Sequence, residues 1–239
     1  MEEGRFYFRQ WLAGRDLAAG NPAARQMVNF VYAIGDRQTG EALLVDPAWA
    51  PSEAVALLEA DDMKLSGVLA THYHPDHVGG DLMGQVQVLG ITELLEEHDV
   101  PIHIQREEAP WVERVTGVGP DQLALHDSDD KVQVGDVEVQ LIHTPGHTPG
   151  SQCFLVEGCL VAGDTLFLEG CGRTDLPGSN PEEMYRSLHD RLARVSSDVV
   201  LFPGHLYSPE ASATMGETRR LNYVFGPQSE ADWLAAFSR

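Results

Sequence analysis

The amino-acid sequence predicts an α+β protein with two strand-rich halves, and three observations support this prediction. Short apolar runs with the length of strands recur in pairs in each half of the chain. Segments with helical spacing of apolar residues lie between these pairs and after them. No linker, low-complexity run or fixed-period repeat interrupts the 239 residues. We therefore predict one domain over residues 1–239, in which the two halves pack sheet on sheet under outer helices.

The first half is predicted to begin with two antiparallel strands over residues 29–34 and 41–46. The connection between them is bounded by Gly35 and Gly40, which favours a tight turn. A helix over 51–62 follows from its apolar spacing. The remaining elements predicted for this half are a strand over 66–71, a helix over 91–98, a strand over 101–105 and a helix over 107–115.

The second half is predicted to open with a hairpin, because strands over 131–134 and 137–142 flank the turn Gly135-Asp136. Two more short strands, over 153–157 and 159–162, meet at Gly158. The elements predicted after them are a helix over 181–195, a strand over 198–202, a helical segment over 210–221 and a short amphipathic segment over 231–237.

Composition and charge exclude several kinds of partner. The chain has 16 basic and 37 acidic side chains and a formal net charge of −21, so its surface repels phosphate backbones and nucleic acid is not expected to bind. No apolar stretch reaches the roughly 18 residues of a membrane span. The N-terminus lacks a secretory pattern, and three cysteines, an odd count, fit a reducing compartment. We therefore expect a cytoplasmic protein.

A dense cluster of potential metal ligands follows one predicted strand. Residues 72–77 read His-Tyr-His-Pro-Asp-His, with three imidazoles and one carboxylate in six positions. Zinc, iron and manganese accept such ligands at about 2.0–2.2 Å. His72 and His74 leave an extended segment on the same side and can reach one ion, whereas Asp76 and His77 can point to a second position. This cluster predicts a metal site at the end of a strand.

Three further metal-competent side chains lie in later loops, each just after a predicted strand. His147 lies in Pro-Gly-His-Thr-Pro-Gly, Asp164 in Gly-Asp-Thr and His205 in Pro-Gly-His. The glycines allow the backbone to approach a site closely. Taken singly, each residue could be a turn histidine, a helix-capping aspartate or a buried structural histidine. Their occurrence together with the 72–77 cluster favours one shared site.

The order of these motifs resembles the metallo-β-lactamase-fold hydrolases, over about Asn29 to Tyr207. The resemblance implies an αββα sandwich of two mixed sheets packed face to face, with the site along one edge. No ligand position departs from the family pattern. It implies two divalent metal ions, with zinc preferred and iron or manganese as alternatives. The implied ligands are His72, His74 and His147 for one ion, Asp76, His77 and His205 for the second, and Asp164 as the bridge.

A binuclear site of this kind predicts hydrolysis. Two ions a few ångströms apart lower the pKa of a shared water from 15.7 toward about 7, which gives hydroxide at neutral pH. The same ions can polarise a carbonyl group. Asp76 is the predicted catalytic residue, because its carboxylate can orient the hydroxide and take its proton. None of the cysteines lies beside a histidine base in the sequence, and nucleophilic side-chain chemistry is not required.

The loop after Asp164 bears on the substrate. It contains Gly-Cys-Gly-Arg, which is similar to the loop of glyoxalase II, a family of thioesterases that cleave S-2-hydroxyacylglutathione. A basic residue at the position of Arg173 helps to hold glutathione in those enzymes, and a guanidinium can bind a carboxylate bidentately. Arg173 is therefore the predicted substrate-binding residue. The alternative is that Arg173 pairs with a surface carboxylate.

The match to glyoxalase II is incomplete. Thr174 and Asp175 stand where that family has an aromatic pair, and the short segment after His205 does not match its long helical extension. The loop is closer to that of the persulfide dioxygenases, which oxidise glutathione persulfide. Those enzymes use one iron, held at positions that match His72, His147 and Asp164.

The retained His205 favours the binuclear hydrolase form over a single-iron site. The sequence therefore predicts a metal-dependent hydrolase acting through metal-bound hydroxide on a thioester of the hydroxyacylglutathione class. The predicted partner is a small thiol-derived molecule, a glutathione conjugate. The alternatives are a persulfide dioxygenase, a lactone or ester hydrolase of the same fold, and a binding or sensor protein with a vestigial site. The complete ligand set argues against the last.

Overall fold

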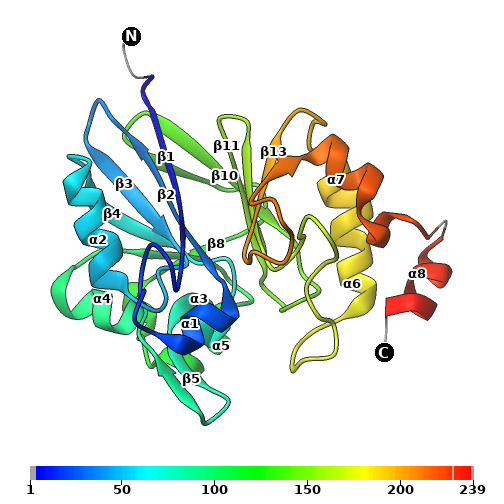
Figure 1. Ribbon diagram of the computed structural model, residues 1–239, viewed down its shortest axis with the longest axis horizontal. Coiled ribbons are helices and arrows are strands. Elements are labelled where there is room, and N and C mark those ends of the chain that lie inside the picture. Colours follow the sequence, from blue (N-terminus) through cyan, green and yellow to red (C-terminus); the bar gives the residue numbers. More distant parts are fainter. Residues whose placement is uncertain (1–3, 228, 238–239) are drawn as a thin grey trace.

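The computed structural model, which describes residues 4–227 and 229–237, is a four-layered α+β sandwich. Two six-stranded mixed sheets pack face to face, and helices cover their outer faces, as Figure 1 shows. The predicted fold class is confirmed, down to the αββα order of layers. Within the described ranges, no helix combines the length and apolar character needed to span a bilayer. That the whole chain is one domain stays a prediction.

The first sheet contains the elements of the N-terminal half. Its strands, in spatial order, are β1 (Phe6–Leu12), β2 (Phe30–Asp36), β3 (Glu41–Val45), β4 (Lys64–Leu69), β7 (Ile102–Gln105) and β8 (Leu123–His126). β1, β2 and β3 are antiparallel neighbours, whereas β3, β4, β7 and β8 run parallel. A small separate hairpin, β5 (Gly80–Leu82) and β6 (Val86–Val88), projects beyond this sheet.

The second sheet contains the C-terminal half. Its strands, in spatial order, are β14 (Ala213–Thr214), β13 (Val200–Pro203), β12 (Cys159–Gly163), β11 (Gln152–Val156), β10 (Val137–His143) and β9 (Lys131–Val134). The predicted hairpin at Gly135-Asp136 is confirmed as β9–β10, and β12 runs parallel to β13. Parallel strands end at the same edge of a sheet, so the loops after β12 and β13 lie side by side.

Alternation along the strands explains why both faces of each sheet are covered. In β2, Phe30, Tyr32 and Ile34 pack into the core between the two sheets, whereas Val31 and Ala33 face the helices of the first half. Each fully buried large side chain of this kind stabilises the fold by about 1.5–3 kcal/mol.

The helices divide between the two outer faces. Those of the first half are α1 (Pro22–Met27), α2 (Pro51–Ala60), α3 (Pro75–Val78), α4 (Ile91–Glu97) and α5 (Ala109–Thr116), with a 3₁₀ turn at Pro120–Gln122. Those of the second half are α6 (Pro181–Arg186), α7 (Met215–Leu221) and α8 (Glu230–Phe237), with a 3₁₀ turn at Tyr223–Phe225. Trp233 of α8 is fully buried in the core of that outer layer.

The predicted helix over 181–195 is only partly correct. It is α-helical to Arg186, after which Ser187–Arg191 is a π-helix and Leu192–Arg194 a 3₁₀ turn. The Ser187 hydroxyl donates to the Pro145 carbonyl at 2.7 Å, and the Arg191 guanidinium donates to the His143 carbonyl at 2.7 Å. The widened turn therefore accompanies contacts with the loop that carries His147.

The predicted start of the next helix at Glu210 is wrong. Residues 213–214 form the edge strand β14, and α7 begins at Met215. Thr214 and Glu217 form a capping box, in which each side chain accepts a hydrogen bond from the other residue's backbone N–H at 3.2 Å. The sequence Thr-Met-Gly-Glu carries this signal, which marks the correct helix start.

Candidate metal centre

The seven predicted ligands lie at one edge of the sandwich, where strands of both sheets end. His72 and His74 follow β4, Asp76 and His77 lie in the short helix α3, and the rest follow strands of the second sheet: His147 after β10, Asp164 after β12 and His205 after β13. Backbone hydrogen bonds join the two sheets at this edge, from Gln152 N to Thr71 O at 2.9 Å and from Phe30 N to Gly204 O at 2.8 Å. The site is thus built where the two halves meet.

One group of donor atoms is formed by His72, His74 and His147. The Nε2 atom of His72 lies 3.1 Å from Nδ1 of His74, which lies 3.0 Å from Nε2 of His147. All three ligand atoms lie within 4.8 Å of one another. Nitrogens on a tetrahedral zinc at about 2.0–2.1 Å would be roughly 3.3 Å apart, so this spacing fits one ion.

A second group is formed by Asp76, His77 and His205. The Nε2 atoms of the two histidines lie 3.2 Å apart. The Asp76 Oδ2 atom lies 3.6 Å from Nε2 of His77 and 3.4 Å from Nε2 of His205. These ligand atoms also lie within 4.8 Å of one another, which fits a second ion.

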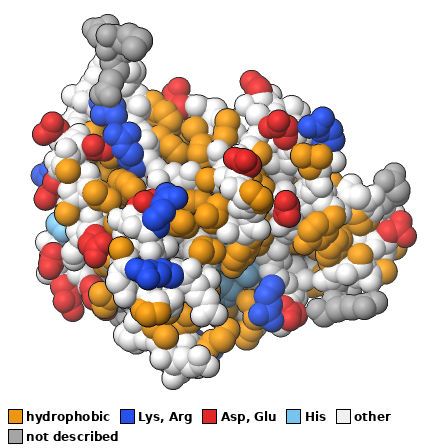
Figure 2. Space-filling view, viewed as in Figure 1, with side chains coloured by type: hydrophobic (Ala, Val, Ile, Leu, Met, Phe, Trp, Pro, Cys, Tyr) orange, Lys and Arg blue, Asp and Glu red, His pale blue; other side chains and the backbone are white. Residues whose placement is uncertain are grey.

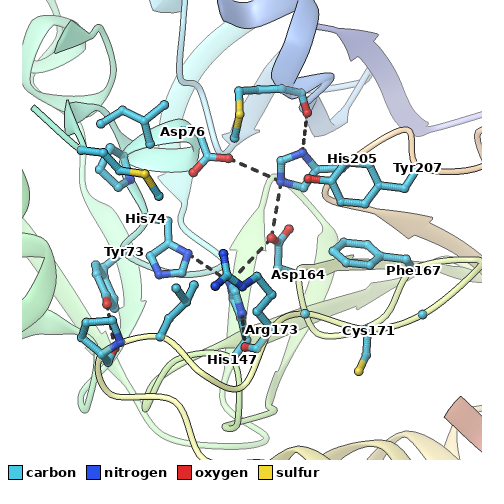
Figure 3. A pocket seen from close by; sticks show the side chains of 18 of the residues that line it. Tyr73, His74, Asp76, His147, Asp164, Phe167, Cys171, Arg173, His205 and Tyr207 are labelled. Atoms are coloured by element: carbon cyan, nitrogen blue, oxygen red, sulfur yellow. Dashed lines mark hydrogen bonds and ion pairs between the residues drawn. The ribbon is translucent and has the colours of Figure 1, made fainter. Parts of the chain in front are cut away.

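Asp164 connects the two groups, as the dashed contacts in Figure 3 show in part. Its Oδ2 atom lies 3.6 Å from Nε2 of His147 and 3.4 Å from Nε2 of His205, and its Oδ1 atom lies 3.4 Å from Nε2 of His77. Oδ1 is buried and accepts no hydrogen bond from any described residue. A buried carboxylate oxygen without a donor is costly unless a cation satisfies it, and this supports the fit of divalent ions here.

Electrostatics differ between the two groups. Burial, together with neighbouring imidazoles, holds the pKa of His72 well below its usual range and lowers the pKa of His74 to about 3. Neutral imidazoles of this kind are ready to bind a cation. In the other group burial opposes protonation, but the carboxylates of Asp76 and Asp164 outweigh it and raise the pKa of His77 to about 10.

Glycines make this close approach possible. A Cβ atom on Gly204 would lie 2.3 Å from Oδ1 of Asp164, and one on Gly172 would lie 2.1 Å from the Asp164 carbonyl oxygen. No side chain fits at either position without displacing the bridging residue. Steric exclusion therefore explains why glycine occurs at Gly204 in Pro-Gly-His and at Gly172 in Gly-Cys-Gly.

Backbone carbonyls fix the orientation of two of the histidines. The Nδ1 atom of His147 lies 2.8 Å from the Arg173 carbonyl, and that of His205 lies 2.7 Å from the Met27 carbonyl. A carbonyl can only accept, so each Nδ1 carries the proton and each Nε2 is directed at the cluster.

Asp46 orients two more histidines, and the sequence analysis did not identify it. Its Oδ2 atom accepts from Nδ1 of His77 at 2.8 Å and from the Thr71 hydroxyl at 2.6 Å. Because that hydroxyl donates to Asp46, its oxygen is available to accept from Nδ1 of His72 at 2.9 Å. In the sequence Asp46 is visible only as an aspartate at the end of a predicted strand. The pairing of β3 with β4 brings that end beside Thr71 and His72.

Asn29 holds the predicted catalytic carboxylate. Its amide nitrogen donates to Oδ2 of Asp76 at 3.0 Å, and its oxygen accepts from the Trp49 indole at 2.9 Å. Both Asn29 and Trp49 are buried. The indole fixes the amide orientation, so the donor group faces Asp76.

Glu108 is a fully buried carboxylate that links two ligand-bearing loops, and it was also missed. It accepts from the backbone N–H of Tyr73 at 2.7 Å and from that of Gly150 at 2.6 Å. Tyr73 lies between His72 and His74, and Gly150 lies three residues after His147. Burial raises the pKa of Glu108 to about 7, although its hydrogen bonds oppose this. Glu107 is an exposed neighbour, and sequence alone does not distinguish the two.

A cavity of about 660 Å³ opens onto the cluster and is lined by His74, Asp76, His147, Asp164 and His205. Figure 2 shows histidine at the bottom of a hollow bordered by hydrophobic side chains. We call the seven His and Asp ligands the floor, although His72 and His77 are buried and do not line the cavity. We call the lining residues Met83, Arg173, Tyr207 and Tyr223 its mouth.

Arg173 lies at the mouth, where its side chain is 63% exposed and its guanidinium pairs with Asp175 at 2.8 Å. The surface carboxylate considered as an alternative partner is therefore present, and the substrate-binding role of Arg173 stays a prediction. Cys171 also lines the cavity, but burial raises the pKa of its thiol to about 12. That thiol is therefore not a nucleophile at neutral pH.

Comparisons with known proteins agree with this geometry. The family model for the metallo-beta-lactamase superfamily matches residues 25–207. The probable polyketide biosynthesis zinc-dependent hydrolase BaeB of Bacillus velezensis is 31% identical over 199 residues, which cover 82% of this chain and 81% of that protein. The mitochondrial persulfide dioxygenase ETHE1 of Homo sapiens is 30% identical over 198 residues, 81% of this chain and 70% of that protein. The crystal structure of ETHE1 from Myxococcus xanthus superposes with a TM-score of 0.76 at 25% identity and covers 98% of this chain and 90% of that one.

Proposed function

This chain belongs to the metallo-beta-lactamase superfamily, and within it we propose a binuclear metal-dependent thioesterase that acts on conjugates of the hydroxyacylglutathione class. The observation that carries the proposal is the presence of two complete ligand groups joined by Asp164. A single-ion enzyme has less use for the second group. The proposed ions are zinc, with iron or manganese as alternatives.

The proposed ligands are those on which the two groups are built. His72, His74 and His147 would hold one ion, Asp76, His77 and His205 the other, and Asp164 would touch both. When bound, divalent ions supply Lewis-acid chemistry that acidifies water and polarises a carbonyl group.

Asp76 is the proposed catalytic residue. Its carboxylate lines the cavity and is 8% exposed, so it can reach a water molecule between the floor and a substrate. Asn29 holds Oδ2, which leaves the remaining lone pairs of the carboxylate to orient that water and accept its proton. Burial raises the pKa of Asp76, but His77 and His205 outweigh it, so the carboxylate is ionised and able to act as a base.

The proposed substrate is a small thiol-derived molecule. Arg173 is the one Lys or Arg among the described residues that line the cavity, and its guanidinium can exchange the exposed Asp175 for a substrate carboxylate. Glutathione presents such carboxylates. A cytoplasmic location is proposed with it, since glutathione chemistry belongs to reducing compartments.

A second candidate is favoured by a specific finding. ETHE1 persulfide dioxygenase of Homo sapiens is 30% identical, and a dioxygenase would need only His72, His147 and Asp164 for one iron. In this chain Nε2 of His147 lies 3.6 Å from Oδ2 of Asp164, a spacing that allows both residues to bind one ion.

Two assays on the same metal-analysed preparation separate the candidates. The first follows loss of the thioester of S-lactoylglutathione, and the second follows oxygen uptake with glutathione persulfide. Two equivalents of bound metal with thioester cleavage support the proposed function. One equivalent of iron with oxygen uptake would refute the thioesterase and support the dioxygenase. Activity in neither assay would refute both and favour a lactone or ester substrate.

A further inference from the structure

The mouth of the cavity is unusually apolar for a protein of net charge −21. Of the six large hydrophobic side chains exposed in the described ranges, three line this one cavity: Met83 is 78% exposed, Tyr223 63% and Tyr207 51%. They come from separate elements, namely the β5–β6 turn, the 3₁₀ turn at Tyr223–Phe225 and the loop after β13. Exposed apolar groups gathered from several elements around one opening indicate a ligand-binding surface.

The apolar lining continues from the mouth to the floor. Tyr207 stacks on His205 with ring centroids 4.6 Å apart and planes at 7°, and Phe167 lies 5.1 Å from Tyr207. Figure 3 shows both rings beside His205. Met27, Leu82 and Val115 add aliphatic groups to the lining of the same cavity. An apolar chain that starts at the reacting carbonyl therefore has apolar side chains to contact within the same cavity as it leaves the site.

Charge in the cavity limits what else can bind there. Apart from the ligands themselves, the charged residues that line the cavity in the described part of the chain are Arg173 and the acidic Asp81 and Glu169. A polyanion would meet these two carboxylates with one cation to offset them. In Figure 3 Arg173 lies over His147, whereas Tyr207 lies over His205. The carboxylate anchor thus lies beside His147 and the Tyr207 ring beside His205, whereas Tyr223 lines a second hollow together with Arg173.

We propose that the substrate is a thioester with an extended apolar acyl chain, which lies along Met83 and Tyr207 while a carboxylate of the thiol portion binds Arg173. The proposal rests on the proposed thioesterase function and names the acyl group that it selects. In the reaction one water is consumed, a C–O bond forms and the C–S bond breaks, which yields the acyl chain as a carboxylate, the thiol portion with its sulfur protonated, and one proton released to solvent. A two- or three-carbon hydroxyacyl group would leave most of this surface uncovered.

The test compares S-acyl glutathiones that differ only in the acyl group, namely lactoyl, acetyl, hexanoyl and octanoyl, with the metal-loaded protein. We expect kcat/KM to rise about tenfold or more from acetyl to octanoyl, because each added methylene covers apolar surface. In the variant Met83→Ser, kcat/KM should fall about three- to tenfold for the octanoyl substrate and little for the acetyl substrate. Leu221→Ser is the matched control, since Leu221 is 73% exposed on α7 and does not line the cavity.

Binding of uncleavable thioethers keeps the two proposals separate. S-octylglutathione should bind the native protein about tenfold more tightly than S-methylglutathione, and Met83→Ser should reduce that ratio. Thioester cleavage with flat chain-length dependence and equal thioether affinities would overturn the acyl-chain inference and leave the thioesterase intact. Tight, Met83-dependent octyl binding without cleavage of any thioester would retain the apolar site but refute the thioesterase, and with it the substrate assigned here.

Discussion

The floor and the mouth of the cavity are built in opposite ways. On the floor, His147 and His205 are oriented by backbone carbonyls and His77 by the buried Asp46, so each donor atom has one accessible direction. At the mouth, the Arg173 side chain is 63% exposed and, among the described residues, forms an ion pair with its near neighbour Asp175 alone. Met83 lies at the tip of a two-stranded hairpin. The floor is buried and its side chains are held by hydrogen bonds, whereas the side chains of Arg173 and Met83 at the mouth are exposed and have few contacts with the rest of the fold.

This difference separates the two parts of the function. Chemistry depends on donor positions that strand ends and glycines fix to within a few tenths of an ångström. Substrate choice is proposed to depend on side chains of the mouth, of which Met83 and Arg173 are exposed, whereas Tyr207 stacks on His205. Changes on the floor should therefore remove metal and rate together, and changes at Met83 and Arg173 should alter selectivity alone.

The largest effect is expected for Asp164→Asn, since Asp164 contacts both ligand groups. Loss of the carboxylate charge should lower metal-dependent activity by about a thousandfold or more, beyond the 10–100-fold typical of an outer hydrogen-bond partner. Steady-state kinetics and metal analysis of the purified variant check this. Retention of both ions at native affinity would remove Asp164 from the bridge.

His205→Ala should be the next most damaging change. It removes one ligand of the second group and leaves His72, His74 and His147 intact, so we expect loss of one ion and about a hundredfold or more of the rate. His98→Ala, at the end of α4, is the control. Near-native turnover in the His205 variant would favour the single-iron dioxygenase.

Glu108→Gln tests a residue that supports the floor without belonging to it. Glutamine can accept from only one of the Tyr73 and Gly150 N–H groups, so the loops bearing His74 and His147 lose a link. Metal affinity should fall about 10–100-fold, as measured by competition with a chelator. The exposed neighbour supplies the control, and Glu107→Gln should bind metal normally. Equal metal affinities in the two variants would show that Glu108 does not support metal binding.

The raised pKa of Glu108 also predicts how the stability of the native protein depends on pH. The folded pKa of Glu108 is raised to about 7, above its unfolded value of 4.5. Its contribution is therefore complete below about pH 4.5 and is lost as the pH rises through 7. In chelated samples, the unfolding free energy of the native protein relative to Glu108→Gln should fall by about 2–3 kcal/mol between pH 5 and 8. Parallel pH curves from urea denaturation would contradict the raised pKa.

Arg173→Ala should have the smallest effect, confined to the mouth. The pair with Asp175 is exposed, so the free energy of unfolding should change by less than about 1 kcal/mol. KM for S-acyl glutathiones should rise about three- to tenfold with kcat nearly unchanged. Arg106→Ala removes a similar exposed pair, with Asp127, and should leave both constants unaltered. A fall in kcat alone would contradict a binding role.

The same division explains what the sequence could predict. Strands and ligands of the floor have local signals, since His72 follows an apolar run and opens a dense His/Asp cluster, and His147 and Asp164 each follow a strand and are adjacent to glycine. Asp46, Asn29 and Glu108 are far from the motifs in sequence and become recognisable only through strand pairing. β1 was missed because Arg9 and Gln10 interrupt its aromatic pattern, as an edge strand allows, and the β5–β6 hairpin because it is too short to show a period.

The most direct test of the binuclear floor is a zinc titration of the chelated protein, in which bound metal and the rate of thioester cleavage are measured on the same samples. We predict that the rate reaches its plateau only when two equivalents are bound. A plateau at one equivalent, with no further binding, would contradict the account.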